Sequence, residues 1–162
     1  MSQICSSFDM GRSEEGIFIQ ISDDSLNMPS LSDTAYVREY LKSQFPAGIE
    51  TSHGVIYMNK RGRGEFTNGS YTKMLQRENF GLFLVKMNLS PAIPAILEIA
   101  QLISVEPPSH ERGDVITAFK RSKAFVKVNG QMFSFDVLTA LYPDGREVFY
   151  DINNIKNMRD SI

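Results

Sequence analysis

The sequence predicts an α+β fold in which N-terminal helices pack on one face of a C-terminal antiparallel β-meander. Two observations indicate this architecture. Residues 115–155 form three β-rich runs that are separated by clear turns, and helix-like apolar patterns come before them. Helices followed by consecutive antiparallel strands are typical of a single sheet that is covered by helices on one side.

The first turn of the meander is Asn129-Gly130. Asn-Gly favours a type I′ hairpin because both central residues of that turn need a positive φ. A two-residue turn pairs Val126 with Phe133 on an apolar face that should be buried. It pairs Lys123 with Asp136 on the opposite face, which is cationic and aromatic. That face is either solvated, with a Lys123–Asp136 ion pair, or a platform for an anionic, aromatic ligand such as RNA.

The N-terminal part of the chain divides into an arm and a domain. Residues 1–32 are polar and are expected to be a flexible arm, in which residues 1–15 carry no helix or strand pattern. Residues 16–21 fit either a short strand or an arm that docks on the domain. A single α+β domain is expected over residues 33–162, beginning with a helix that Asp33 caps.

Three further segments precede the meander. Residues 48–51 and 55–58 read as two short strands, and Lys60–Phe66 reads as a basic loop rich in glycine. Ser90 and Pro91 then begin a helix that is expected to reach Val105 and to cover the apolar face of the meander.

Composition limits the classes of function. The 162 residues suit one domain, and the net charge of −2 means that nucleic acid would have to bind a local basic patch. The only cysteine is Cys5, so no internal disulfide can form and a reducing, cytoplasmic location is expected. No signal peptide is recognised, and no stretch approaches the roughly 18 apolar residues of a membrane helix. No metal site and no cofactor are predicted.

Several segments together resemble a known family. They are Tyr36-Val37-Arg38-Glu39-Tyr40-Leu41, Gly54-Val55-Ile56-Tyr57, Ile93-Pro94-Ala95-Ile96-Leu97, Val126-Lys127-Val128-Asn129-Gly130-Gln131, Asp144-Gly145 and Tyr150-Asp151-Ile152. In their order they are similar to the third class of large polyvalent protein-associated domains of phages and mobile elements. The resemblance implies a fold like that of the barnase, EndoU, colicin and RelE ribonucleases, with metal-independent RNA cleavage and a toxin or effector role. It supplies no catalytic motif residue by residue.

The candidate site residues follow from the chemistry of such cleavage, which needs a base, an acid and cations at the phosphate. The predicted catalytic residues are His53, Glu65, Arg63 and Lys120, and the predicted nucleic-acid-binding residues are Lys60, Arg61, Arg121 and Lys123. A surface turn histidine, a solvated basic loop and a charge-protected edge strand are the competing interpretations.

Two functions therefore stay open at the level of sequence. One is a metal-independent endoribonuclease toxin or effector, with RNA as substrate and a cognate inhibitor as partner. The other is a non-enzymatic module of a phage or mobile element that binds and inhibits a host protein. The acidic net charge favours the second function, whereas the local basic segments favour the first.

Overall fold

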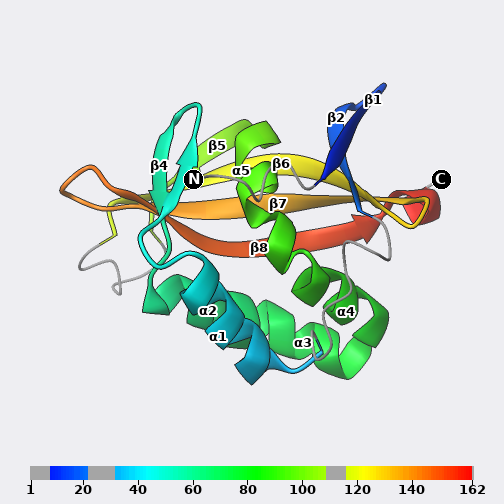
Figure 1. Ribbon diagram of the computed structural model, residues 1–162, viewed down its shortest axis with the longest axis horizontal. Coiled ribbons are helices and arrows are strands. Elements are labelled where there is room, and N and C mark those ends of the chain that lie inside the picture. The colour runs from blue at the N-terminus through cyan, green and yellow to red at the C-terminus, as the bar shows by residue number, and fades with distance from the viewer. Residues whose placement is uncertain (1–7, 22–31, 109–115, 162) are drawn as a thin grey trace.

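A computed structural model describes residues 8–21, 32–108 and 116–161 (Figure 1). The strands are β1 (Asp9–Ser13), β2 (Gly16–Ile21), β3 (Ile49–Thr51), β4 (Gly54–Tyr57), β5 (Gln101–Glu106), β6 (Ala118–Val128), β7 (Gln131–Leu141) and β8 (Glu147–Asn157). The helices are α1 (Thr34–Gln44), α2 (Lys60–Asn68), α3 (Ser70–Glu78), α4 (Phe80–Asn88) and α5 (Ile93–Ile99), with short 3-10 turns η2 (Ser90–Ala92) and η4 (Met158–Ser161).

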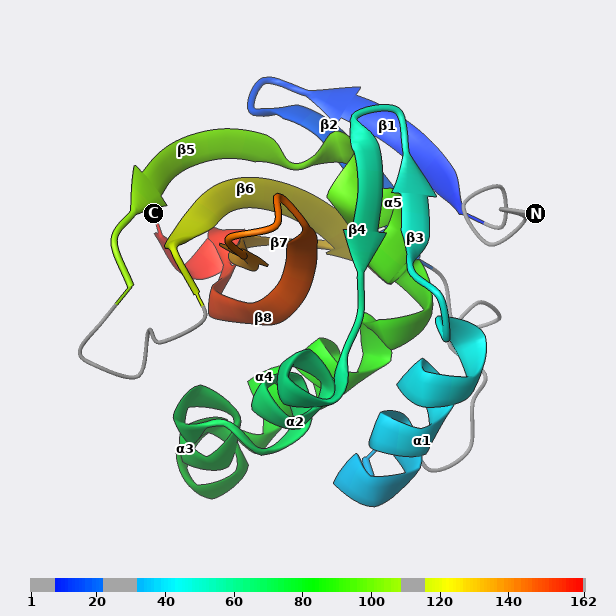
Figure 2. The same ribbon diagram turned by 90° about the vertical axis from the view of Figure 1, so that its left-hand side faces the viewer.

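The strands form one mixed eight-stranded sheet, and this corrects the predicted fold class. The order is β1-β2-β6-β7-β8-β4-β3, with β5 also paired to β6. Strands β2 and β4 run parallel to β6 and β8. The prediction of N-terminal helices on a C-terminal antiparallel meander is therefore wrong, because strands β1 to β5, which precede the meander in the chain, extend it at both edges. The sheet curls into a half-barrel with helices against one face (Figures 1 and 2).

Inside that larger sheet, the predicted β6–β7 hairpin is confirmed with its register. Val126 pairs with Phe133 and Lys123 pairs with Asp136. Asn129 and Gly130 have φ values of 50° and 89°, as a type I′ turn requires. Phe133 and Phe135 are 5% and 0% exposed, so the apolar face is buried as predicted, and Ser134 and Asp136 on the other face of β7 are buried too. Local turn chemistry and the two-residue period of a strand thus determine this part of the fold.

The helix predicted from Ser90 to Val105 is much shorter. It consists of η2 and α5 and ends at Ile99, and the backbone then continues as β5. Residues 80–99 are also apolar and long enough by composition to cross a membrane, contrary to the expectation from sequence. In the structure this run is divided between α4, η2 and α5, and 67% of its most apolar stretch of 18 residues is buried inside the fold. It forms the apolar layer beneath the sheet.

Part of the N-terminal arm belongs to the sheet. Strands β1 and β2 form an antiparallel hairpin, and β2 pairs with the C-terminal half of β6. Ile19 and Ile21 are buried in the core, as is Phe8. The expectation of no strand within residues 1–15 is wrong for β1. The boundary at residue 33 and the flexibility of the arm stay predictions.

The segment Lys60–Phe66, predicted as a glycine-rich loop, is the beginning of α2. The side chain of Asn59 caps this helix by accepting a hydrogen bond from the Gly62 backbone N–H at 2.9 Å. A Cβ atom at Gly62 would collide with the carbonyl oxygen of Phe149 on β8, whereas Gly64 has open space around it. Gly62 therefore serves the close approach of helix to strand rather than the approach of a ligand.

A buried ion pair links the helical layer to the sheet. Lys86 of α4 donates to Asp151 of β8 at 2.7 Å, and their side chains are 0% and 4% exposed. Lys86 also donates to the Thr72 hydroxyl at 2.7 Å and lies over the ring of Phe66. Burial raises the pKa of Asp151 to about 6, although Lys86 opposes the shift. Burial also lowers the pKa of Lys86, so desolvation outweighs the attraction within the pair.

Candidate functional site

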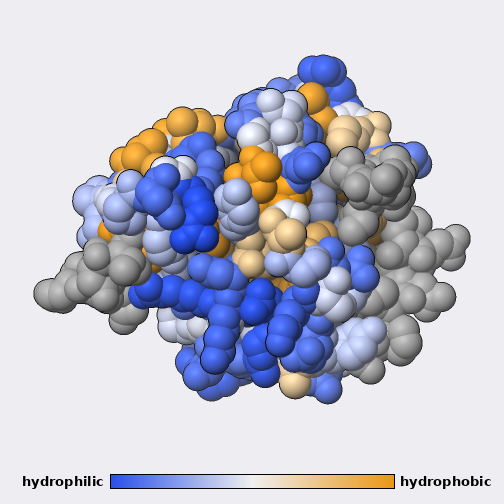
Figure 3. Space-filling view, turned by 60° about the vertical axis from the view of Figure 1, so that its left-hand side comes forward, coloured by the Kyte–Doolittle hydropathy of each residue, from blue (hydrophilic) through white to orange (hydrophobic). Residues whose placement is uncertain are grey.

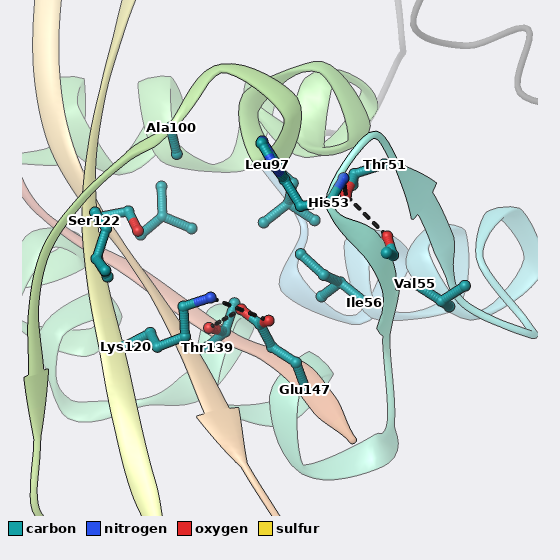
Figure 4. Close-up of a pocket in the computed structure, with 13 residues that line it drawn as sticks. Thr51, His53, Val55, Ile56, Leu97, Ala100, Lys120, Ser122, Thr139 and Glu147 are labelled. Carbon is teal, nitrogen blue, oxygen red and sulfur yellow. Dashed lines mark hydrogen bonds and ion pairs between the residues drawn. The ribbon is translucent and has the colours of Figure 1, made fainter. Parts of the chain in front are cut away.

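A cleft of about 270 Å³ opens between β4 and β6 on the helix-covered face of the sheet (Figure 4). Its wall is apolar where Ile56, Leu97 and Val137 contribute, and polar where Lys120, Thr139 and Glu147 contribute. Small-molecule sites usually enclose about 300–1,000 Å³. The cleft is therefore large enough for a phosphate and part of a nucleotide, but not for a whole large ligand.

Three polar side chains meet on one wall of the cleft. Lys120 of β6 contacts Glu147 of β8 with Nζ 3.3 Å from Oε1. Thr139 of β7 donates its hydroxyl to Oε2 of the same carboxylate at 2.6 Å. Because three neighbouring strands supply these groups, the sheet itself holds the carboxylate in place. Both side chains of the Lys120–Glu147 pair remain partly exposed toward the cleft.

His53 lies at the opposite rim, in the tight turn between β3 and β4 (Figure 4). Glu98 of α5 holds this turn, because its carboxylate accepts hydrogen bonds from the backbone N–H of Ser52, at 2.9 Å, and from the Ser52 hydroxyl. These bonds lower the pKa of Glu98, and so keep it ionised. No hydrogen bond joins His53 to Lys120 or Glu147 among the contacts of the described residues. The histidine lies on the side of the cleft away from the Lys120–Glu147 pair, and Figure 4 shows its side chain beside Leu97.

The cleft thus unites two of the predicted catalytic residues, His53 and Lys120. The other two, Arg63 and Glu65, lie on α2 and do not line it. The charge of Glu65 instead acts on the buried Lys86–Asp151 pair. Because Arg63 and Glu65 are close in sequence, they were expected to lie in one basic loop. In the helix α2, neighbouring side chains point in different directions around the axis.

The predicted nucleic-acid-binding residues also separate. Lys60 and Arg61 lie in the first turn of α2, where Lys60 is exposed and Arg61 half-buried. Arg121 and Lys123 lie on the face of β6 opposite the cleft. There Arg121 contacts Glu106 and Asp136, both at 2.9 Å, and Lys123 contacts Asp136 at 3.3 Å. Neighbouring carboxylates therefore pair with both of these cations, as the predicted Lys123–Asp136 pair indicated.

Sequence reasoning missed Glu147 and Thr139. One signal was available, because the predicted hairpin register places Lys120 opposite Thr139 on the same face. The pairing of β7 with β8 contains irregularities between Ser134 and Asp136 and between Leu138 and Thr139. Such bulges shift the face on which a side chain lies, so the position of Glu147 could not be obtained by counting along the strand.

The arrangement has the elements of acid–base chemistry at a phosphate. A carboxylate and an imidazole both line the cleft, and an ammonium group lies beside the carboxylate. An entering anion would compete with Glu147 for Lys120 and would thereby free one carboxylate oxygen to accept a proton. Within the described residues no group of three or more His, Cys, Asp or Glu side chains is placed to hold a metal ion.

Comparison with known proteins identifies the family. The family model of the large polyvalent protein-associated domain 3 matches residues 31–150. No curated protein and no solved structure matches this chain. The likeness to the ribonuclease fold group therefore stays a prediction. The matched segment covers most of the chain and includes α1, the cleft and the β6–β7 hairpin. The chain therefore belongs to the large polyvalent protein-associated domain 3 family and is a module associated with phages or mobile elements.

Proposed function

We propose that the protein is a metal-independent endoribonuclease whose active site is the cleft between β4 and β6. The observation that carries this proposal is the convergence of His53, Lys120 and Glu147 from three separate parts of the chain on one small cleft. Such convergence supplies an acid, a cation and a base within a single binding site.

Each side chain has a defined role in the proposed reaction. Glu147 takes the proton of the ribose 2′-OH, and the 2′-oxygen attacks the adjacent phosphorus. The bond from phosphorus to the 5′-oxygen breaks, and protonated His53 gives its proton to that leaving oxygen. The products are a 2′,3′-cyclic phosphate and a free 5′-OH. Lys120 stabilises the extra negative charge of the phosphorane.

The environment of Glu147 supports its role as base. Thr139 donates to one carboxylate oxygen and so fixes its orientation, while the contact with Lys120 occupies the other. A phosphate that draws Lys120 away exposes this second oxygen to the 2′-OH. Lys60 and Arg61, near the end of β4, are proposed to hold the flanking RNA backbone. Arg121 and Lys123 are left out of this role, because carboxylates already neutralise them.

The test is cleavage of a labelled single-stranded RNA by the purified chain in the presence of a chelator. We expect a 2′,3′-cyclic phosphate product and no cleavage of an RNA whose scissile ribose lacks the 2′-OH. His53→Ala and Glu147→Gln should each slow cleavage by at least about 100-fold, the usual lower range for losing an acid or a base.

Glu39→Gln is the matched control, because Glu39 is an exposed carboxylate on α1 that does not line the cleft. Thermal unfolding of each variant separates loss of chemistry from loss of folding. Absence of cleavage by the folded wild-type chain, or equal rates for wild type and both cleft variants, contradicts the proposal.

The second candidate function is binding and inhibition of a host protein. The observation that favours it is the pairing of cations across the sheet, since Lys120, Arg121 and Lys123 all contact carboxylates. A polyanion must displace these carboxylates, whereas a protein partner need not. Stoichiometric capture of one protein from a bacterial lysate by both the wild type and His53→Ala, without RNA cleavage, would support this function instead. In either case the toxin or effector is proposed to act in the cytoplasm.

A further inference from the structure

Strand β5 exposes an apolar edge at the border of the sheet. Leu102, Ile103 and Val105 are 57%, 51% and 57% exposed, which are three of the highest values among the large apolar residues that the structure describes. Figure 3 shows a hydrophobic patch in orange at the upper left, on the side of the molecule where β5 lies. Within the described residues, β5 pairs with β6 alone, so its other backbone edge has no strand beside it.

An edge of this kind is rare in a protein that acts alone. An unpaired strand edge offers a row of N–H and C=O groups to other chains, and charged residues, proline or very short strands normally protect it. Strand β5 has six residues, one bulge between Leu102 and Ser104, and only one charge, Glu106, which already contacts Arg121; the bulge leaves Leu102, Ile103 and Val105 exposed. Strand β3 at the far border has only three residues. A protein segment that binds the β5 edge does so best as an extended strand, because a strand pairs with the whole row of N–H and C=O groups.

The side chains of β5 fall on two faces in a definite pattern. A bulge separates Leu102 from Ser104, so Leu102 pairs with Ser122 and Val105 pairs with Lys120. Both Ser122 and Lys120 line the cleft, and Leu102 does so as well. Leu102 and Val105 therefore share the cleft-side face, and Gln101, Ser104 and Glu106 share the other face.

This pattern is self-complementary. In an antiparallel pair of two β5 strands around a two-fold axis, residues that face each other must lie on the same face of the sheet. A register that places Leu102 opposite Val105 of the second copy satisfies this condition at both ends. It also places Gln101 opposite Glu106, so an amide meets a carboxylate and no like charges meet.

We infer that two copies of the chain associate through antiparallel pairing of their β5 strands and form one continuous sheet across the dimer. The second copy covers the exposed apolar side chains of the first and supplies partners for its free backbone groups. Because Leu102 lines the cleft, Val105 of the second copy extends the cleft wall. This inference does not depend on RNA cleavage.

The first experiment measures mass in solution by analytical ultracentrifugation over a wide range of concentration. One pair of strands buries little area, so we expect a weak, concentration-dependent dimer. The double variant Ile103→Lys/Val105→Lys should remain a monomer over the same range, because lysine side chains on the edge oppose strand pairing. Val55→Lys is the control, since Val55 is an exposed apolar residue on β4 and should leave the dimer intact.

The second experiment tests the register. In a Cys5→Ser background, Leu102→Cys/Val105→Cys should form disulfide-linked dimers under mild oxidation, because each new thiol faces its counterpart across the axis. Leu102→Cys/Val55→Cys should not. A wild type that remains monomeric at every concentration overturns the inference, as does a dimer that the lysine double variant leaves unchanged. If the chain stays monomeric and another protein covers the β5 edge instead, the occupant is a strand of that protein. This outcome would also overturn the inference.

Discussion

The buried Lys86–Asp151 pair gives the sharpest test of how this fold is stabilised. In Lys86→Met, the methionine keeps most of the volume and removes the charge. Asp151 would then be a carboxylate that is 4% exposed with no counter-ion at Oδ1. Breaking a buried pair by removing one partner costs about 3–5 kcal/mol, because the remaining charge is uncompensated. For a chain of this size the melting temperature should fall by roughly 6–20 °C at neutral pH.

The pH dependence of the same variant adds a second, independent signature. Burial already raises the pKa of Asp151 to about 6 in the intact pair, above its ordinary value of 3.8. A folded acid with a raised pKa binds its proton more tightly than the unfolded chain does. Its contribution to stability is present below about pH 4 and is lost as the pH rises through about 6. Lys86 opposes this shift, so its removal raises the pKa further and moves the loss to higher pH.

The assay is urea unfolding at several pH values between 4 and 8, with a double variant and a surface control. Lys86→Met should be most destabilised near pH 8 and should approach the wild type near pH 4. Lys86→Met/Asp151→Leu should regain most of the lost stability, because an apolar pair replaces an ionic one and the Thr72 hydroxyl still donates to the Phe66 carbonyl. Arg77→Met, which breaks an exposed pair with Glu78, should cost less than about 1 kcal/mol. A Lys86→Met variant as stable as the wild type at pH 8, or a double variant no better than the single one, would refute the reasoning.

Three further predictions concern the core and the sheet. Phe133→Ala should cost about 3–5 kcal/mol in urea unfolding through lost burial and a cavity, while Met132→Ala on the other face should cost about 1 kcal/mol or less. Gly62→Ala should destabilise by about 1–3 kcal/mol, because its Cβ collides with the Phe149 carbonyl, whereas Gly64→Ala should be neutral or stabilising; equal effects would contradict the packing role of Gly62. Deleting residues 1–15 should lower the melting temperature, because it removes β1 and the buried Phe8 and leaves β2 as an edge; an unchanged value would show that β1 contributes nothing.

The β6–β7 hairpin could be predicted in detail because its determinants are local. Asn129-Gly130 specifies the turn, and the alternation of side chains along each strand specifies the faces. The same alternation accounts for Lys120 and Ser122 on the cleft-side face and for Arg121 and Lys123 on the other. Short-range chemistry was sufficient for this part of the fold.

Two other segments were misread for opposite reasons. Gly62 and Gly64 suggested a loop, because glycine costs about 1 kcal/mol in a helix interior. The cap at Asn59 and the packing of α2 on β8 offset that cost. Residues 101–106 continue the apolar spacing of α5 and suggested more helix. These residues instead pair with the N-terminal half of β6 and become a strand of the sheet. Their own sequence could not predict this, because the partner strand lies later in the chain.

The candidate site depends on this same long-range pairing. Strand β4 is brought beside β8 by only two paired residues, Ile56 with Glu147 and Tyr57 with Val148. That short pairing places the turn with His53 at the rim of the cleft. The pairing of β6 with β7 places Lys120 in the wall of the same cleft. Strand β5 then lies directly beside Lys120, because Val105 pairs with it.

The proposed active site and the proposed dimer edge are therefore neighbours in the sheet, but different groups of atoms form them. The cleft uses the side chains of Lys120 and Glu147, whereas the dimer uses the outer backbone edge of β5. Substituting His53 or Glu147 should leave the dimer intact, since neither residue lies on β5. Lysine at Ile103 and Val105 should abolish the dimer, and because Val105 pairs with Lys120 it also adds positive charge beside the cleft. If cleavage changes only when that strand is altered, while His53→Ala and Glu147→Gln have no effect, the chemistry lies outside the cleft even though the dimer is real.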